Sequence, residues 1–216
     1  MHDAQYLKIE KSARYFLSGP LDKEYDTICF ALHGYGQLGQ YFIHNFKLPD
    51  LDKTLFIAPE GLHRFYLNGT SGRVGASWMT KEDRLKDIED YCYYLDRVYH
   101  HFKVKIATVE KVGILGFSQG VATACRWISK SSYQFDFLIN WAGAFPPDLD
   151  VEESIRKMNP IPVHLLLGDE DEYISMEQFK SHTELLRSQG FKLETTTFKG
   201  KHKIYSEVLK ELFNKL

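Results

Sequence analysis

A serine lies at the centre of a glycine-flanked motif, G-F-S-Q-G at positions 116–120. The motif follows an apolar segment and precedes a segment of helical period, so it falls where a strand turns sharply into a helix. On such a turn the serine is held in a strained backbone conformation with its hydroxyl exposed above the sheet. Glycine is needed at 116 and 120, because a side chain there would collide with the neighbouring strand and helix. Small residues also cluster in ordinary turns, but this position predicts that Ser118 is a nucleophile.

A serine hydroxyl is a weak nucleophile at neutral pH and needs a histidine to accept its proton, with a carboxylate to orient that histidine. In proteins that carry the nucleophile on this kind of turn, the three residues follow one another along the chain in the order serine, acid, histidine. Of nine histidines, only His182 and His202 follow a plausible acid that itself comes after a strand. His182 lies inside a helical segment, where packing or solvent exposure is the simpler interpretation. His202 follows the last expected strand in a loop that can reach back over the sheet edge, and we predict that it is the base.

The acid should come from the turn after the apolar segment 163–168. Four acidic residues crowd together there: Asp169, Glu170, Asp171 and Glu172. A solvated acidic turn or a fortuitous cation site would explain most of them, yet one should approach His202 because the strand end points toward the same rim as Ser118. Spacing alone leaves both Asp169 and Asp171 open.

Acyl transfer also needs backbone N–H groups directed at the oxygen on which negative charge develops. The first candidate donor is the N–H of Gln119, the residue after the nucleophile. The second should come from the first strand-to-helix loop, where the chain reads H-G-Y-G-Q at 33–37. We predict that the N–H of Tyr35 is this second donor; the alternative is that the glycines form only a flexible connection.

Alternating strands and helices must position these groups. Five segments are too apolar to be half-exposed, which suits parallel strands covered on both faces: 27–32, 55–59, 111–117, 137–143 and 163–168. Segment 192–198 fits a last strand. Helical periodicity is found in four further segments: 81–102, 119–131, 175–189 and 203–215.

Local signals complete the expected architecture. Thr80 and Asp83 resemble a capping box at the start of the longest helix. Near the N-terminus, 6–13 and 14–17 predict a β-hairpin. The predicted fold class is therefore α/β, with a mostly parallel sheet, an antiparallel N-terminal hairpin and helices on both faces.

Length and composition limit the class of protein. With 216 residues against about 150 per domain, we expect one domain over 1–216. A formal charge of −2 gives no electrostatic attraction to nucleic acid. The charged N-terminus lacks an export segment, and no apolar stretch is long enough to span a membrane. Cys29, Cys92 and Cys125 have no C-x-x-C spacing that would bind zinc or carry out redox chemistry. These features predict a cytoplasmic protein without a cofactor or metal.

Four motifs in order, L-H-G-Y-G-Q, G-F-S-Q-G, the G-D-E-D turn and G-K-H, resemble the phospholipase/carboxylesterase family of α/β-hydrolases, which includes the acyl-protein thioesterases. The resemblance spans about 24–215. It implies an α/β-hydrolase fold without a cap domain that hydrolyses carboxylic esters or thioesters of lipids or small acyl compounds. It also implies a catalytic triad of Ser118, His202 and, from the family pattern G-x-x-D, Asp171.

Two departures leave the pocket and the substrate open. Gln37 stands where the family often has an acid, and Ile174-Ser175 replaces a valine-proline pair. Trp78, in a segment similar to the tryptophan-bearing loop of the family, is a candidate for one wall of the acyl pocket and equally for plain core. Phe145 is a candidate for the opposite wall.

The expected reaction is a two-step acyl transfer to and from Ser118. Segment 60–79 can shape an entrance but hardly seal one, which favours small or solvent-presented acyl substrates. One alternative is a serine peptidase or aminoacyl hydrolase, although no residues that bind a substrate terminus stand out. A second alternative, a non-catalytic binding protein, would typically lack a triad member. A metal enzyme is a third, but the adjacent His100 and His101 do not have zinc-like spacing. The sequence does not determine the oligomeric state.

Overall fold

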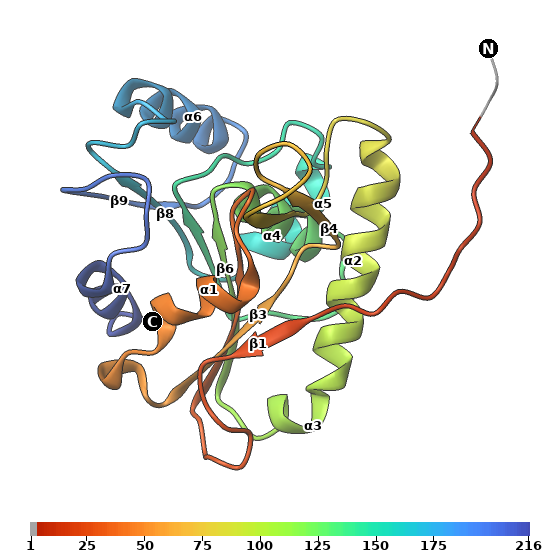
Figure 1. Ribbon diagram of the computed structural model, residues 1–216. Coiled ribbons are helices and arrows are strands. Elements are labelled where there is room, and N and C mark those ends of the chain that lie inside the picture. Colours follow the sequence, from red (N-terminus) through yellow and green to blue (C-terminus); the bar gives the residue numbers. More distant parts are fainter. Residues whose placement is uncertain (1–3) are drawn as a thin grey trace.

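A computed structural model describes residues 4–216 of the chain (Figure 1). Seven strands form the main sheet in the order β1-β3-β2-β6-β7-β8-β9. Their bounds are Tyr15–Leu17 (β1), Thr27–Leu32 (β2), Thr54–Pro59 (β3), Lys111–Phe117 (β6), Phe137–Trp141 (β7), Val163–Gly168 (β8) and Glu194–Phe198 (β9). All neighbouring strands are parallel except β1, which runs antiparallel to β3.

The five apolar segments found in the sequence form the middle of this sheet, β2, β3, β6, β7 and β8, and almost every residue in them is buried. Strands buried on both faces have no polar face, which is why they read as continuous apolar runs. The predicted fold class, a mostly parallel α/β sheet, is therefore confirmed.

Helices cover both faces of the sheet (Figure 1). Their bounds are Gly39–Phe42 (α1), Arg84–His101 (α2), Lys103–Ile106 (α3), Gln119–Lys130 (α4), Val151–Met158 (α5), Met176–Ser188 (α6) and Ser206–Phe213 (α7). Trp127 of α4 meets the ring of Phe30 edge-on, with ring centroids 5.3 Å apart. Phe213 of α7 packs against Phe56 in β3 and Phe137 in β7. The aromatic core thus joins the sheet to helices of the central and C-terminal parts of the chain.

The expected N-terminal hairpin is not formed. Segment 6–13 has no regular structure and is exposed, while β1 pairs with β3 instead. Charge explains the difference: Lys8 forms an ion pair with Asp90, and Lys11 donates to the carbonyl of Leu62. A segment this polar gains little by joining a sheet whose neighbouring strands are buried.

The expected capping box of α2 is also absent. Asp83 precedes the helix in a left-handed conformation, with φ at 49°, and its side chain accepts no capping hydrogen bond. The hydroxyl of Thr80 accepts from the N–H of Glu82, and the N–H of Thr80 donates to Asp87. Thr80 therefore orders the turn before the helix rather than the helix terminus itself.

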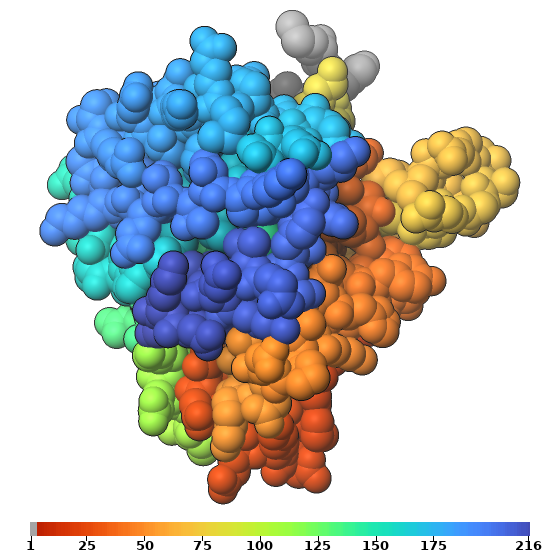
Figure 2. Space-filling model, turned by 90° about the vertical axis from the view of Figure 1, so that its left-hand side faces the viewer, coloured from red at the N-terminus to blue at the C-terminus, as the bar shows by residue number. Residues whose placement is uncertain are grey.

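Two further strands, His63–Tyr66 (β4) and Val74–Ser77 (β5), form an antiparallel hairpin outside the main sheet. Figure 2 shows it as the gold lobe that projects from the body of the molecule. The expected strand 55–59 ends before this hairpin and the expected helix 81–102 begins after it, so the hairpin was not predicted.

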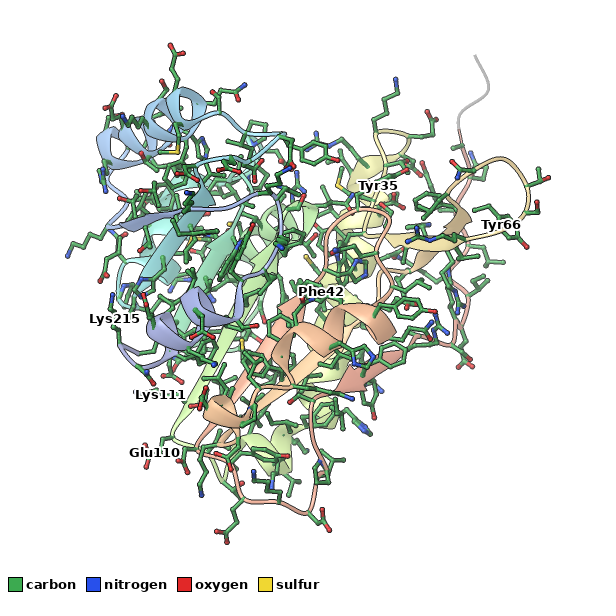
Figure 3. The ribbon with its side chains drawn as sticks, turned by 60° about the vertical axis from the view of Figure 1, so that its left-hand side comes forward. Tyr35, Phe42, Tyr66, Glu110, Lys111 and Lys215 are labelled. Atoms are coloured by element: carbon green, nitrogen blue, oxygen red, sulfur yellow. The ribbon has the colours of Figure 1, made fainter. Side chains whose placement is uncertain are left out.

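The loops that follow the parallel strands meet at one edge of the sheet. In Figure 3, Tyr35, which follows β2, lies at the upper edge, whereas Lys111, the first residue of β6, lies near the opposite end. Ligands of open parallel sheets bind at the carboxyl ends of the strands, so this upper edge is where a site is expected.

Candidate active site

Ser118 occupies a sharp turn between β6 and α4. Its φ of 54° and ψ of −115° lie in a region that side-chain-bearing residues rarely adopt. The N–H of Ser118 donates to the carbonyl of Trp141, and its own carbonyl accepts from Val121. Such a conformation persists only when the surrounding structure holds it, and it is the strained strand-to-helix turn expected from the sequence.

The flanking glycines allow this turn to pack closely. A Cβ on Gly116 would lie 2.5 Å from the carbonyl oxygen of Gly120, and a Cβ on Gly120 would lie 2.1 Å from that of Leu32. Both distances are shorter than any real Cβ contact. The turn that carries Ser118 is thus pressed directly against the end of β2.

His202 lies in the loop after β9 and contacts Asp171, which follows β8. The distance from His202 Nδ1 to Asp171 Oδ2 is 2.7 Å, and the Asp171 side chain is 0% exposed. On its other side the imidazole packs against Phe117, the residue before Ser118, with ring centroids 5.0 Å apart. The structure therefore brings His202 together with a buried carboxylate and with the turn of the candidate nucleophile.

The acidic turn is built into this arrangement rather than merely solvated. Of the two carboxylates that spacing left open, Asp171 contacts the imidazole, while Asp169 accepts the N–H of Gly200 at 2.9 Å. Glu172 accepts the N–H of His202 at 3.1 Å, which lowers its pKa. Three of the four acids thus hold the loop that carries His202.

His182 is placed elsewhere, as a half-buried residue of α6. Its Nε2 accepts the N–H of Phe145 at 3.1 Å, and the ring packs against that of Phe145. Burial lowers its pKa. Of the two environments expected for His182, packing or solvent exposure, packing is the one that this structure shows.

The loop at 33–37 lies against Ser118 on the β2 side, away from the β8–β9 side that carries His202 and Asp171. A Cβ on Gly34 would be 3.1 Å from the Cβ of Ser118. Within residues 4–216, neither the N–H of Tyr35 nor that of Gln119 is hydrogen-bonded to a protein acceptor, and Gln119 is the first residue of α4, where N–H groups have no intrahelical partner. Two candidate donors are therefore free next to the turn of Ser118.

Neutral hydrogen bonds hold this loop in place. Buried His33 accepts the N–H of Gly61 with Nε2, so its Nδ1 carries the proton and donates to the carbonyl of Gly34 at 2.8 Å. Burial lowers the pKa of His33 to about 4. Gln37 accepts the N–H of Gly34 with its side-chain oxygen at 2.8 Å. The amide of Gln37 thus occupies the position where the family pattern often has an acid.

The hairpin β4–β5 supports the same loop. The N–H of Gly36 donates to the carbonyl of Ala76, and the N–H of Ala76 donates to the carbonyl of Gln37. Gly75 permits this contact, because a Cβ there would lie 2.4 Å from the oxygen of Gly36. The loop is therefore attached to the hairpin by an isolated antiparallel β-bridge between Gln37 and Ala76.

Neither of the two candidate pocket residues lines an open surface. Trp78 is 0% exposed, and its indole N–H donates to the carbonyl of His33 at 2.8 Å. Phe145 is buried against Phe191 and His182. Both belong to the core, and Trp78 supports the 33–37 loop through its hydrogen bond to His33.

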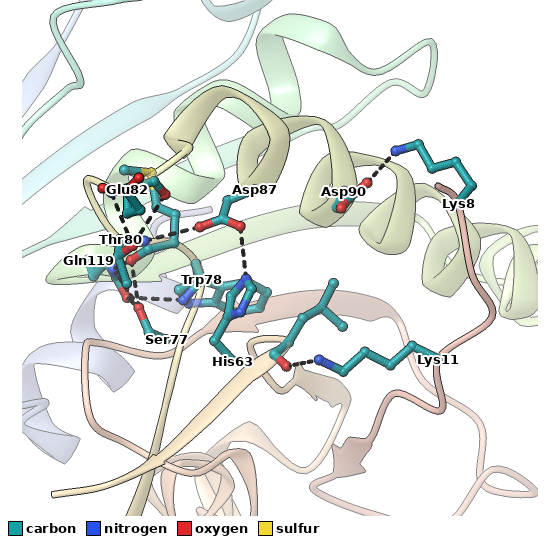
Figure 4. A network of polar contacts seen from close by, with 12 residues as sticks. Lys8, Lys11, His63, Ser77, Trp78, Thr80, Glu82, Asp87, Asp90 and Gln119 are labelled. Atoms are coloured by element: carbon teal, nitrogen blue, oxygen red, sulfur yellow. Dashed lines mark hydrogen bonds and ion pairs between the residues drawn. The ribbon is translucent and has the colours of Figure 1, made fainter. Parts of the chain in front are cut away.

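The side chain of Gln119 holds the same region, because its oxygen accepts the N–H of Trp78 (Figure 4).

A cavity of ≈ 330 Å³ lies between the 33–37 loop, the hairpin β4–β5 and the start of α2. Tyr35 and Phe65 form one side of it, and Ser77, His63 and Asp87 contribute polar atoms. Sequence reasoning missed this cavity because it missed the hairpin. The alternation of β4, which places His63 and Phe65 on the same face, is the one signal that could have indicated it.

Comparisons with known proteins give the family of the chain and structures of similar fold. A family model described as Phospholipase/Carboxylesterase matches residues 15–216. Among solved structures, Zea mays acyl-protein thioesterase 2 is similar, with 19% identity, a TM-score of 0.71, and coverage of 94% of this chain and 97% of that chain. Esterase PE8 has 19% identity, a TM-score of 0.70 and coverage of 95% and 99%. A Bacillus cereus carboxylesterase has 13% identity, a TM-score of 0.64 and coverage of 94% of each chain. At these identities the likeness concerns the fold alone.

No curated protein matched the chain. Among residues 4–216, no group of three or more His, Cys, Asp or Glu side chains is arranged to hold a metal ion, and no helix has the length and apolar character needed to cross a bilayer.

Proposed function

The chain belongs to the phospholipase/carboxylesterase family, and from that premise we propose that it is a serine hydrolase acting on carboxylic esters or thioesters through an acyl-enzyme on Ser118. The contact that carries the proposal is the 2.7 Å distance between His202 Nδ1 and the buried Asp171 Oδ2. It lies at the same sheet edge as the strained turn of Ser118. Substrates are small or solvent-presented acyl compounds, since the hairpin β4–β5 projects away from the body of the molecule instead of folding over it as a lid (Figure 2).

In the proposed first step the hydroxyl oxygen of Ser118 attacks the carbonyl carbon. Asp171 accepts a hydrogen bond from the N–H at Nδ1 of His202, which leaves Nε2 as the base that takes the serine proton. The carbonyl π electrons move onto oxygen, where the N–H groups of Tyr35 and Gln119 donate to the developing negative charge. Nε2 then protonates the leaving oxygen or sulfur as the tetrahedral intermediate collapses.

The second step repeats the first with water as the nucleophile. His202 accepts a proton from water, the hydroxide attacks the acyl-enzyme, and the proton returns to the oxygen of Ser118 as the carboxylic acid leaves. In both steps Asp171 orients the imidazole of His202 and stabilises the transient imidazolium.

Ser118→Ala tests this proposal with p-nitrophenyl acetate as substrate. Loss of the nucleophile should lower kcat about a thousandfold or more, whereas Ser132→Ala, at an exposed serine after α4, should leave kcat unchanged. A fluorophosphonate should add its mass to the peptide containing Ser118 and to no other. Turnover retained in Ser118→Ala, or labelling at another residue, would contradict the assignment.

A further inference from the structure

The ≈ 330 Å³ cavity beside the 33–37 loop has an aromatic side. The rings of Tyr35 and Phe65 pack together with centroids 5.1 Å apart, and the Tyr35 residue is 60% exposed. Pockets for small ligands start at about this volume and are commonly lined by aromatic side chains with a few polar groups. The face of an aromatic ring carries partial negative charge and attracts cations.

The polar side of the cavity is acidic. Asp87 Oδ1 lies 3.1 Å from His63 Nε2, and its second oxygen accepts the N–H of Thr80 (Figure 4). Glu82 also lines the cavity, and within residues 4–216 its carboxylate has neither a hydrogen-bond nor an ion-pair partner. Two carboxylates and one histidine therefore line the cavity, so the net charge of these three groups is negative whether or not His63 is protonated.

The basic residues that follow on α2 do not neutralise this charge. Arg84 forms an ion pair with Asp148 at 2.9 Å, and Lys86 forms one with Glu89 at 3.0 Å. Strand alternation places Arg64 on the opposite face of β4 from His63 and Phe65. A cation bound in this cavity would therefore have both the aromatic rings and the carboxylate of Glu82 among its lining groups.

Sheet order determines which part of a substrate reaches the cavity. Across the sheet, Ser118 follows β6, with β2 on one side and β7, β8 and β9 on the other. His202 and Asp171 thus lie on the β8–β9 side, whereas Tyr35 and the cavity lie on the β2 side. The leaving group must be near His202 to receive its proton, so the remaining substituent of the carbonyl carbon, the acyl chain, is the one that can extend past Tyr35.

We propose that the cavity selects short acyl chains that end in a positively charged ammonium group. This inference rests on the hydrolase function proposed above and adds the class of its acyl substrate. In this arrangement the charged head lies against Tyr35 and Phe65 with the carboxylate of Glu82 beside it. The structure thereby supplies what the sequence did not reveal, a set of residues able to bind a charged substrate terminus.

The test compares two p-nitrophenyl esters of matched shape, 4-(trimethylammonio)butanoate and its neutral isostere 5,5-dimethylhexanoate. At low ionic strength the native protein should favour the cationic ester about tenfold in kcat/KM, as expected for one partly exposed ion pair together with a cation–π contact. Added salt should reduce this preference, because it screens the carboxylate. A ratio of one or less at low salt would overturn the proposal.

Variants at Glu82 locate the effect. Glu82→Gln should lower the ratio of the two kcat/KM values at least threefold, and Glu82→Lys should bring it below one. Glu177→Gln, at an exposed carboxylate in the first turn of α6, is the matched control and should keep the native ratio. An unchanged ratio in both Glu82 variants would overturn the assignment to this cavity.

A binding measurement separates this proposal from the hydrolase function. Ser118→Ala is titrated with the methyl esters of the same two acids and followed by calorimetry. Saturable binding of the cationic ester that Glu82→Lys weakens supports the cavity even if neither p-nitrophenyl ester is hydrolysed. Equal binding of the two methyl esters, or none, overturns the cation site, and hydrolysis of the neutral ester would still leave the proposed function standing.

Discussion

The two sides of Ser118 are held by different kinds of interaction. On the β8–β9 side, carboxylates accept hydrogen bonds from the loop of His202: Asp171 from the imidazole, Asp169 from Gly200 and Glu172 from the backbone of His202. On the β2 side, the 33–37 loop is held by neutral groups, the imidazole of His33 and the amide of Gln37.

The difference follows from what each side must do in the proposed reaction. The imidazole of His202 must gain and lose a positive charge, and a buried carboxylate stabilises that charge directly. The 33–37 loop must present an N–H group without reorganising, and close backbone packing with neutral hydrogen bonds achieves this. We therefore expect loss of charge to affect mainly the β8–β9 side and loss of an acceptor to affect mainly the β2 side.

The largest effect is expected from Asp171→Asn. The amide can no longer stabilise the imidazolium, and it favours the wrong tautomer of His202, so kcat should fall by about 10³ to 10⁴. Asp169→Asn is the matched control: its side-chain oxygen can still accept the N–H of Gly200, and its kcat should change by less than about threefold. Ester hydrolysis under saturating substrate measures both. A larger loss in Asp169→Asn than in Asp171→Asn would show that the acid has been assigned to the wrong carboxylate.

On the β2 side, buried His33 predicts that the free energy of unfolding depends on pH. The pKa of buried His33 is about 4 in the folded chain against about 6.5 when unfolded. Below pH 6.5 the unfolded state binds the proton first, so stability is complete above that pH and falls as pH drops toward 4. The loss reaches at most about 3 kcal/mol.

Urea unfolding between pH 4 and 8 measures this loss. His33→Gln should flatten the dependence, although it lowers stability at neutral pH because it disturbs two buried hydrogen bonds. His182→Gln serves as the comparison, since burial lowers that pKa too but the residue is only half-buried. A native curve that stays level from pH 7 to 4 would contradict a neutral, buried His33.

A smaller effect is expected from Gln37→Ala. It removes the acceptor for the N–H of Gly34, so the loop that carries Tyr35 loses one of its anchors and kcat should fall about tenfold with little change in KM. Gln37→Glu keeps a side-chain oxygen in place and should recover most of this loss. If the glutamate variant is as impaired as the alanine variant, the amide acts through something other than its oxygen.

Most of the sheet could be predicted from the sequence, because strands buried on both faces leave an unmistakable apolar run, as in 111–117 and 163–168. Half-exposed elements leave weaker signals. The hairpin β4–β5 was missed, and 6–13 was wrongly expected to be a strand because local pattern does not reveal which edge strand is available for pairing. That residues 1–216 form one domain stays a prediction.

The candidate site, like the sheet, could be predicted from the sequence only in part. Motif order indicated Ser118 and His202, but spacing left Asp169 and Asp171 open, since the choice depends on which carboxylate reaches across from β8 to the loop after β9. Phe145 was a candidate for a pocket wall and Trp78 for either a pocket wall or plain core, and this choice is decided by packing that no single segment encodes. The catalytic roles of Ser118, His202, Asp171, Tyr35 and Gln119 stay predictions until they are measured.

The smallest effect is expected from Glu172→Gln, which tests whether charge matters on the β8–β9 side away from the imidazole. The glutamine oxygen can still accept the N–H of His202, and the nearby Lys201, 3.8 Å away in an exposed pair, contributes little. We expect kcat to fall by no more than roughly two- to threefold, whereas Glu170→Gln, which changes an exposed neighbour of the same turn, should have no effect. A loss in Glu172→Gln as large as that in Asp171→Asn would mean that the whole acidic turn, and not one buried carboxylate, stabilises the imidazolium.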